Sequence, residues 1–122
     1  TADLFGDIIF TIGCHAGQSV SDIQIGGSLV PLATTGDAPA LSNDWAAHGV
    51  NVNAIAPAFI ETPLTEPMLK DPAFNKYVLE NTPLGRVGKP KDVSSAAFFL
   101  AAEASDYMTG HILLIDGGWT AH

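Results

Sequence analysis

The sequence predicts an α/β fold built around a parallel sheet, and three observations support this. Residues 8–12 form a β-branched apolar run, and residues 50–57 alternate apolar and polar side chains, as strands do. A third apolar run at 111–115 follows a segment with helical periodicity that starts at Pro90. The order strand, helix, strand, irregular segment, helix, strand is typical of βαβ units.

The strand expected at 50–57 carries a mixed pattern of apolar and polar residues. Its valines and alanines at even positions share one face, while Asn51 and Asn53 share the other. Ile55 interrupts this alternation, so we expect both faces to be covered near the end of the strand. The preceding residues 40–48 predict a short helix, and the glycine that follows them provides its C-terminal stop.

Residues 59–89 are divided by prolines at 63, 67, 72 and 83. Two short helices fit between these breaks, at about 64–70 and 73–80. A segment of this kind, without long regular elements, is often a mobile cover over a binding site. We therefore expect residues 59–89, the cover segment, to lie over a substrate.

The composition excludes several classes of function. The 122 residues bound a single domain, and an apolar content of 47% indicates a globular one. A net charge of −8, from 13 acidic and 5 basic residues, argues against nucleic acid and anionic membranes as partners. No apolar run approaches the roughly 20 residues of a membrane span. Glycine loops and helix N-termini can still hold nucleotide phosphates without basic residues.

Cysteine and histidine usage points away from disulfides and metals. Cys14 is the one cysteine of the sequence, so an internal disulfide is excluded. The four histidines have no ligand spacing among themselves or with Cys14, and no metal site is expected. The N-terminus lacks the basic start of a signal peptide, and the expected location is the cytoplasm.

Four segments in a fixed order carry a family resemblance. They are Trp-Ala-Ala-His-Gly-Val-Asn-Val-Asn-Ala-Ile-Ala-Pro at 45–57, Pro-Leu-Gly-Arg-Val-Gly-Lys-Pro at 83–90, Ala-Ser-Asp-Tyr-Met-Thr-Gly at 104–110 and Ile-Asp-Gly-Gly at 115–118. Through them, residues 40–121 resemble the C-terminal region of short-chain dehydrogenases/reductases. Within that family, the sequence is similar to sugar-acid and polyol dehydrogenases of the gluconate type and to 3-oxoacyl reductases.

The resemblance implies a fold, a reaction and a cofactor. The fold is a partial doubly wound, Rossmann-like parallel sheet in a single shortened domain, 1–122. Residues 1–39 form a degenerate cofactor-side portion, and residues 40–122 form the C-terminal half with the cover segment. The reaction is the NAD- or NADP-dependent oxidation of a small alcohol or reduction of a carbonyl, with a sugar acid, polyol or 3-oxoacyl substrate.

The resemblance also assigns cofactor contacts after the strand at 50–57. The family has a Pro-Gly pair where this chain has Pro57 and Ala58. Downstream, Ile60 would offer backbone groups to the nicotinamide carboxamide, and Thr62 would hydrogen-bond the carboxamide or a cofactor phosphate. Such a carboxamide needs a donor and an acceptor fixed side by side. The alternative is that Ile60 only packs and Thr62 starts a turn before Pro63.

The N-terminus resembles the family's glycine loop more loosely. Gly13 and Gly17 match its first two glycines, and Ser19 stands at the third. Glycines there let the backbone approach a pyrophosphate at a helix N-terminus. A rival alignment places residues 3–18 on a helix, which would set Asp3 at the place of a catalytic Asn.

The catalytic centre of the family is not found in this sequence. The family uses Tyr-x-x-x-Lys on one helical face with an upstream Ser. Tyr77 is followed four residues later by Asn81, and Tyr107 by His111. Thr34 stands weakly at the place of the Ser, and no other catalytic residue is predicted. The segments that would hold the Tyr and Lys, and those that would choose between NAD and NADP, look deleted.

Three interpretations of this gap stay open. The chain is an oxidoreductase of the family, a catalytically inactive fragment or interaction subunit, or part of a longer enzyme. In each, a small-molecule substrate site and a homo-oligomer are expected. The oligomer would form through the C-terminal strand and the helix before it, because the run at 111–115 has no polar alternation and needs cover on both faces.

Overall fold

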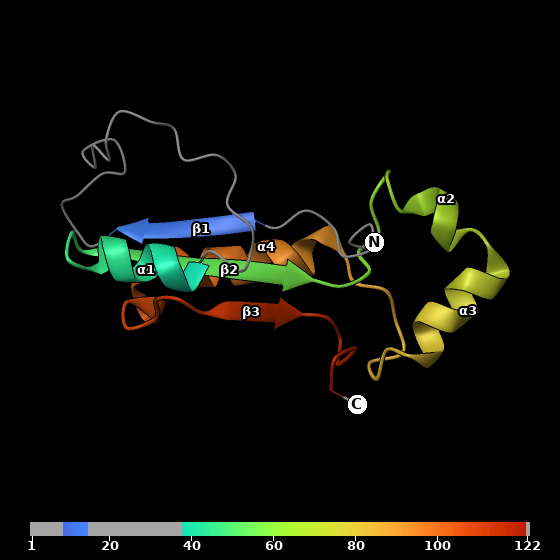
Figure 1. The fold of residues 1–122 in the computed structure, drawn as a ribbon. Helices are drawn as coiled ribbons and strands as arrows, with labels where there is room; N and C mark the ends of the chain where they lie inside the picture. The colour runs from blue at the N-terminus through green and yellow to red at the C-terminus, as the bar shows by residue number, and fades with distance from the viewer. Residues whose placement is uncertain (1–8, 15–37, 122) are drawn as a thin grey trace.

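The computed structural model describes residues 9–14 and 38–121. Each element expected in these ranges is present. Its ends lie within two residues of the prediction, except that the helix expected at 90–103 ends at Leu100. In chain order the elements are β1 (Ile9–Cys14), α1 (Ala38–Ala46), β2 (Val50–Pro57), α2 (Glu66–Leu69), α3 (Pro72–Glu80), α4 (Pro90–Leu100), a 3₁₀ helix at Glu103–Ser105, and β3 (Ile112–Ile115), as Figure 1 shows.

The sheet has the order β1-β2-β3, with β2 in the centre. β2 and β3 are parallel, with Ala54 opposite Ile112 and Pro57 opposite Ile115, and α4 forms part of the connection between them. This parallel pair confirms the α/β fold. β1 runs antiparallel to β2, with Ile9 opposite Ile55. This direction was not predicted, because apolar patterning sets which face of a strand is buried and not which way the strand runs.

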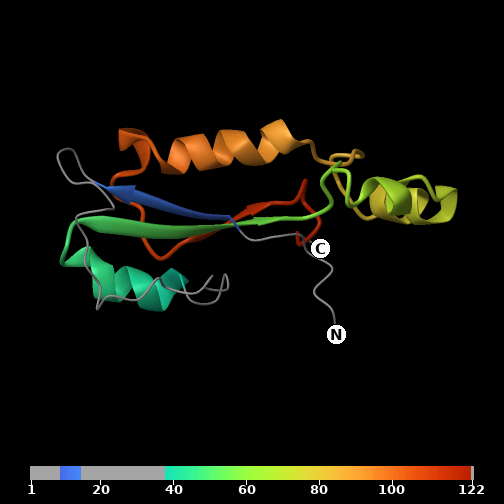
Figure 2. The same cartoon turned by 90° about the horizontal axis from the view of Figure 1, so that it is seen from above.

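Two helices cover opposite faces of the sheet, so the described part has three layers (Figure 2). On one face, α1 packs on β2 through a cluster of Ala38, Val50, Val52 and Ala54, with Leu41 and Trp45 against it. On the other face, α4 packs on the sheet through a cluster of Ile55, Ile60, Val93 and Leu100, with Ala96, Ala97, Met108, Leu113 and Ile115 against it. The break in alternation at Ile55 therefore does mark a strand that is buried on both sides.

The asparagines of β2 connect the strand to the segment that precedes β3. Asn53 is 1% exposed. Its Nδ2 donates to the Met108 carbonyl at 2.9 Å, and its Oδ1 accepts from the His111 N–H at 3.1 Å. Asn51 donates to the Asp106 carbonyl at 3.0 Å. A buried amide is tolerated because its polar atoms are hydrogen-bonded, and here those bonds fix where β3 begins.

The cover segment extends beyond the sheet. Figures 1 and 2 show α2 and α3 past the carboxyl end of β2, over neither face of the sheet. Asp71 caps α3, because its Oδ1 accepts from the Ala73 N–H at 2.8 Å. Among the described residues, no helix is long and apolar enough to cross a membrane.

Candidate cofactor and substrate site

The carboxyl ends of β2 and β3 open into a cleft of about 190 Å³. In open α/β sheets, ligands bind in the crevice outside the carboxyl ends of the parallel strands. The residues around this cleft come from the loops that follow the two strands and from the segment that leads into α4: Ala58, Phe59, Ile60, Thr82, Leu84, Arg86, Gly88, Asp92, Leu114, Ile115, Asp116 and Gly117.

Ile60 and Gly88 form an isolated parallel bridge beside this cleft. The Gly88 N–H donates to the Phe59 carbonyl at 3.0 Å, and the Glu61 N–H donates to the Gly88 carbonyl at 2.8 Å. In a parallel bridge the groups that bond belong to the residues on either side of Ile60. The N–H and C=O of Ile60 itself therefore point away from Gly88, side by side, as a donor and an acceptor.

The absence of a side chain at Gly88 leaves room for the Ile60 side chain beside this bridge. A Cβ there would lie 2.5 Å from Ile60 Cδ1 and 3.3 Å from the Phe59 carbonyl oxygen. The Ile60 side chain is 9% exposed and belongs to the α4-side core. Core packing on one side and the bridge on the other thus fix the orientation of the Ile60 peptide groups.

Thr65 holds the same peptide from the cover segment, and sequence reasoning missed it. Its hydroxyl donates to the Ile60 carbonyl and accepts from the Thr62 N–H at 3.0 Å. Since that hydroxyl has one proton, the Thr62 hydroxyl, 3.0 Å away, donates to Thr65. The signal in the sequence was the Thr-x-x-Thr spacing at 62–65, because threonines three apart often bond each other's backbone at the start of a helix.

Arg86 and Asp92 connect the end of the cover segment to α4. Arg86 Nη1 and Nη2 lie 2.7 and 3.2 Å from the two Asp92 oxygens, a bidentate pair. Asp92 also accepts from the Lys89 N–H at 2.7 Å, in the first turn of α4. The hydrogen bonds from Arg86 and Lys89 lower the pKa of Asp92 to about 2, and the carboxylate raises the pKa of Arg86. Asp92 therefore stays charged at neutral pH, where a carboxylate at a helix N-terminus is stabilising.

Asp116 is a turn residue at the end of β3. Its carboxylate accepts from the Thr120 hydroxyl at 2.7 Å, from the Thr120 N–H at 2.9 Å and from the Gly118 N–H at 3.0 Å. The Thr120 hydroxyl is the largest cause of the lowered pKa of Asp116. These bonds shape the C-terminal turn, and Gly117 in that turn accepts from the Leu84 N–H at 3.1 Å. The turn and the 82–88 segment are thereby joined.

The structure brings together the predicted residues after β2. Pro57 is the buried last residue of the strand, and Ile60 and Thr62 flank the Thr65 hydroxyl. Ala58, at the place of the family Gly, needs no left-handed backbone: no described non-glycine residue has a positive φ. Its N–H donates to the Ile115 carbonyl at 3.2 Å, which continues the β2–β3 pairing by one residue.

Of the predicted N-terminal contacts, the described residues include Gly13. Gly13 lies inside β1, opposite Asn51, and not in a loop after a strand. The expected strand end at residue 12 was too early, because β1 continues to Cys14. Gly17, Ser19 and Thr34 lie outside the described residues. Within ranges 9–14 and 38–121, no three His, Cys, Asp or Glu side chains are grouped to hold a metal ion.

Comparison with known proteins gives the same family as the sequence motifs. Residues 33–120 match a family model of short-chain dehydrogenases described as enoyl-(acyl carrier protein) reductase. The chain is 46% identical over 100 residues to 2-dehydro-3-deoxy-D-gluconate 5-dehydrogenase of Bacillus subtilis. This match covers 77% of this chain and 39% of the relative. It is 43% identical over 96 residues to a tropinone reductase homolog of Arabidopsis thaliana, and this match covers 79% of this chain and 30% of the relative.

Solved structures share the fold as well. A protein of Agrobacterium tumefaciens with bound NADP is 51% identical, with a TM-score of 0.70 over 72% of this chain and 36% of that one. A gluconate 5-dehydrogenase of Burkholderia cenocepacia, in complex with NADP and tartrate, is 38% identical, with a TM-score of 0.67. The match covers 70% of this chain and 33% of that one.

The fold is α/β and Rossmann-like, with a cleft at the carboxyl ends of its parallel strands. The chain belongs to the short-chain dehydrogenase/reductase family, whose members are NAD(P)-dependent oxidoreductases. It spans less than half the length of the curated relatives it matches.

The close approach of the C-terminal turn to the 82–88 segment predicts a difference between two glycines. Gly117 and Gly85 both have φ of +63°, but a Cβ on Gly117 would lie 2.7 Å from Thr82 Cγ2, and one on Gly85 would meet nothing within 4 Å. We expect Gly117→Ala to lower the free energy of unfolding by about 2–4 kcal/mol, from strained backbone plus the clash. Gly85→Ala, with strained backbone only, should cost about 1 kcal/mol.

Urea unfolding of both variants beside the parent measures this difference. Equal losses for Gly117→Ala and Gly85→Ala would show that the two segments do not pack as closely as described.

Proposed function

We propose that this chain supplies the nicotinamide contact and the substrate cover of an NAD(P)-dependent oxidoreductase that acts on a small alcohol or carbonyl compound. The observation that carries the proposal is the Ile60–Gly88 bridge, which leaves the Ile60 N–H and C=O pointing away from Gly88 at the carboxyl end of β2. A nicotinamide held by these groups would supply the hydride acceptor for an alcohol carbon or the hydride donor for a carbonyl carbon.

The residues of the site fit such a cofactor. A carboxamide presents one C=O and one NH₂ group, which match the Ile60 N–H and C=O. The Ile60 carbonyl already accepts from Thr65, and its second lone pair can accept from the carboxamide. The Thr62 hydroxyl donates to Thr65 and accepts from the Thr65 N–H at 3.3 Å, which leaves one lone pair for a further donor. Pro57, Ile60 and Thr62 are the proposed cofactor-binding residues described here, and Gly13, Gly17 and Ser19 stay predictions.

The chemistry of relatives supports a sugar acid as the substrate. The relatives include 2-dehydro-3-deoxy-D-gluconate 5-dehydrogenases, and the Burkholderia gluconate 5-dehydrogenase was solved with tartrate. A polyol is the second choice, since galactitol 2-dehydrogenase of Cereibacter sphaeroides is 46% identical over 81 residues. The family model's description favours an acyl substrate. The cover segment, with α2 and α3 beyond the strand ends, is the part that would enclose such a molecule.

The alternative is a catalytically inactive fragment or interaction subunit. It is favoured by one observation: neither tyrosine of the sequence has a lysine four residues on. Hydride transfer needs a partner that gives or takes the proton, and the Tyr-Lys pair does this in the family. Both proposals can hold if the Tyr-Lys pair is supplied from outside this chain. A chimera that contains the pair tests whether this chain then supports turnover.

We expect the 122-residue chain to have no measurable turnover with NADP⁺ and gluconate or galactitol, because loss of an acid/base group costs roughly 10²–10⁴-fold in rate. A chimera should turn over: the N-terminal part of the Bacillus subtilis relative, including its catalytic segment, joined to residues 40–121 of this chain. Thr62→Ala in the chimera should raise KM for the coenzyme, and Thr62→Ser should restore it. NADPH formation followed by absorbance measures all four proteins.

A folded chimera without turnover would favour the inactive alternative. Stoichiometric NADPH formation by the 122-residue chain itself would contradict the assignment of the missing proton donor.

We also propose self-association through β3 and α4. β3 is an edge strand of the described sheet. Leu113 and Ile115 pack toward α4, but Ile112 and Leu114, on the opposite face, are 37% and 51% exposed. On α4, Phe98 is 79% exposed. An open strand edge beside exposed apolar side chains favours pairing with a second copy of the chain.

Leu114→Asp should shift the protein toward monomer, because a carboxylate in the interface would lose its hydration. Leu64→Asp is the matched control: Leu64 is 79% exposed but lies in the cover segment. It should associate as the parent does. Light scattering across a concentration series measures the mass of the parent and of both variants. A parent that stays monomeric would contradict the proposal.

A further inference from the structure

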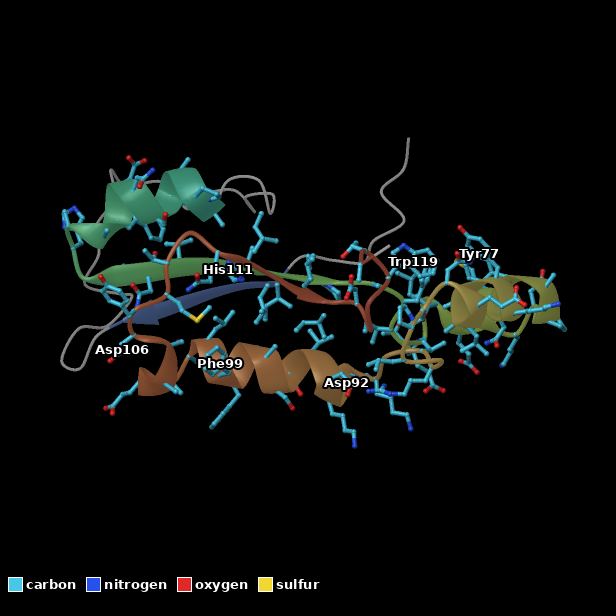
Figure 3. All side chains as sticks on the ribbon, turned by 90° about the horizontal axis from the view of Figure 1, so that it is seen from below. Tyr77, Asp92, Phe99, Asp106, His111 and Trp119 are labelled. Carbon is cyan, nitrogen blue, oxygen red and sulfur yellow. The ribbon has the colours of Figure 1, made fainter. Side chains whose placement is uncertain are left out.

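Four aromatic side chains connect α3, the start of the cover segment at Phe59 and the C-terminal turn. The Trp119 ring lies edge-to-face against Phe59 at 5.0 Å and against Tyr77 at 5.8 Å, between ring centroids. Phe59 lies edge-to-face against Phe74 at 5.6 Å. Trp119 and Tyr77 lie together where α3 meets the C-terminal turn (Figure 3). This aromatic cluster therefore joins three segments that are distant in the sequence.

Each member of the cluster has a fixed relation to the site. Phe59 directly precedes Ile60, and its carbonyl accepts one of the two hydrogen bonds of the Gly88 bridge. Phe74 and Tyr77 belong to α3. Trp119 follows Asp116 in a turn that the Asp116 carboxylate holds, and its N–H donates to the Asp116 carbonyl at 3.1 Å. Trp119 is thus attached to the end of β3, which is part of the sheet.

Besides its members of the aromatic cluster, α3 has one fully buried side chain, that of Val78. Of the other helices and strands, α3 packs substantially only on α2, a helix of four residues that has no buried residue. α2 and α3 project past the sheet without lying on either face (Figure 1). The aromatic cluster is thus one side-chain connection between α3 and the strand ends.

We propose that Trp119 is a positioning residue that couples α3 to the contact segment, residues 59–62, so that the cover and the nicotinamide contact shift together. This rests on the proposed function for the identity of the ligand, but the coupling itself does not. A ligand that fixes residues 59–62 would also order α3 through Phe59 and Trp119, and an ordered α3 would favour the ligand by the same factor.

Hydrogen exchange of the ligand-free protein tests the coupling. Trp119→Leu keeps an apolar side chain but removes two ring contacts, and amide exchange in 72–80 and 59–62 should accelerate roughly tenfold. Exchange in 50–56 should stay as in the parent. Trp45→Leu is the matched control: Trp45 belongs to α1 and packs on the face of the sheet that lies opposite α4. It should leave exchange in 72–80 unchanged.

A second variant covers the case in which Trp119→Leu fails to fold. Tyr77 is 53% exposed, so Tyr77→Leu leaves the core intact. It should accelerate exchange in 72–80 and leave 59–62 as in the parent, because Phe59 keeps its contact with Trp119. Unchanged exchange in 72–80 for either variant, or a uniform acceleration along the whole chain, would overturn the proposal.

Addition of NADP⁺ separates this inference from the proposed function. In the parent, NADP⁺ should slow exchange in 59–62 and also in 72–80. In Tyr77→Leu it should slow exchange in 72–80 less than in the parent, because Phe59–Phe74 is then the ring contact that remains between the two segments. Equal slowing of 72–80 in both proteins would contradict the coupling. If NADP⁺ changes nothing in the parent, the proposed function fails, and the ligand-free comparison alone decides the coupling.

Discussion

The return of the chain to the end of β2 is the constraint on which the rest of the site depends. The chain leaves the sheet at Pro57, runs through α2 and α3, and comes back so that Gly88 pairs with Ile60 before α4 begins. A Cβ at position 88 would lie 2.5 Å from Ile60 Cδ1, so a larger residue there would displace the Ile60 side chain. Without the bridge, neither the direction of the Ile60 peptide groups nor the start of α4 would be fixed.

Charge and side-chain hydroxyls secure this return from both sides. Thr65 holds the Ile60 carbonyl from the cover segment, and Asp92 holds Arg86 and the Lys89 N–H at the start of α4. An exposed ion pair contributes little by itself. The Arg86–Asp92 pair is bidentate, and the same carboxylate also binds a helix N-terminus, so it specifies geometry more than it adds stability.

The sequence predicted the elements of this fold because local signals specify them. Pro90 marks the first residue of α4, Gly49 the end of α1, and the break in alternation at Ile55 marks a strand buried on both faces. The place of the site after Pro57 came from the family motifs and not from periodicity. Ile60 and Thr62 were predicted because those motifs have a fixed spacing.

What could not be predicted depends on contacts between residues that are distant in sequence. The antiparallel direction of β1 is set by tertiary pairing with β2, and an apolar pattern is the same in either direction. Asn53 looked like a polar position on a strand face, but it bonds Met108 and His111. The aromatic cluster joins residues 59, 74, 77 and 119, which no local pattern links.

Amide exchange at single residues, followed by NMR with and without NADP⁺, tests the central claim most directly. The Glu61 and Gly88 N–H groups are bonded within the bridge and should be protected in the free protein, while the Ile60 N–H, which points away from it, should exchange fast. NADP⁺ should then protect Ile60 and leave Glu61 and Gly88 nearly unchanged. An Ile60 amide as protected as that of Glu61 without nucleotide, or one that stays unprotected at saturating NADP⁺, would contradict the account.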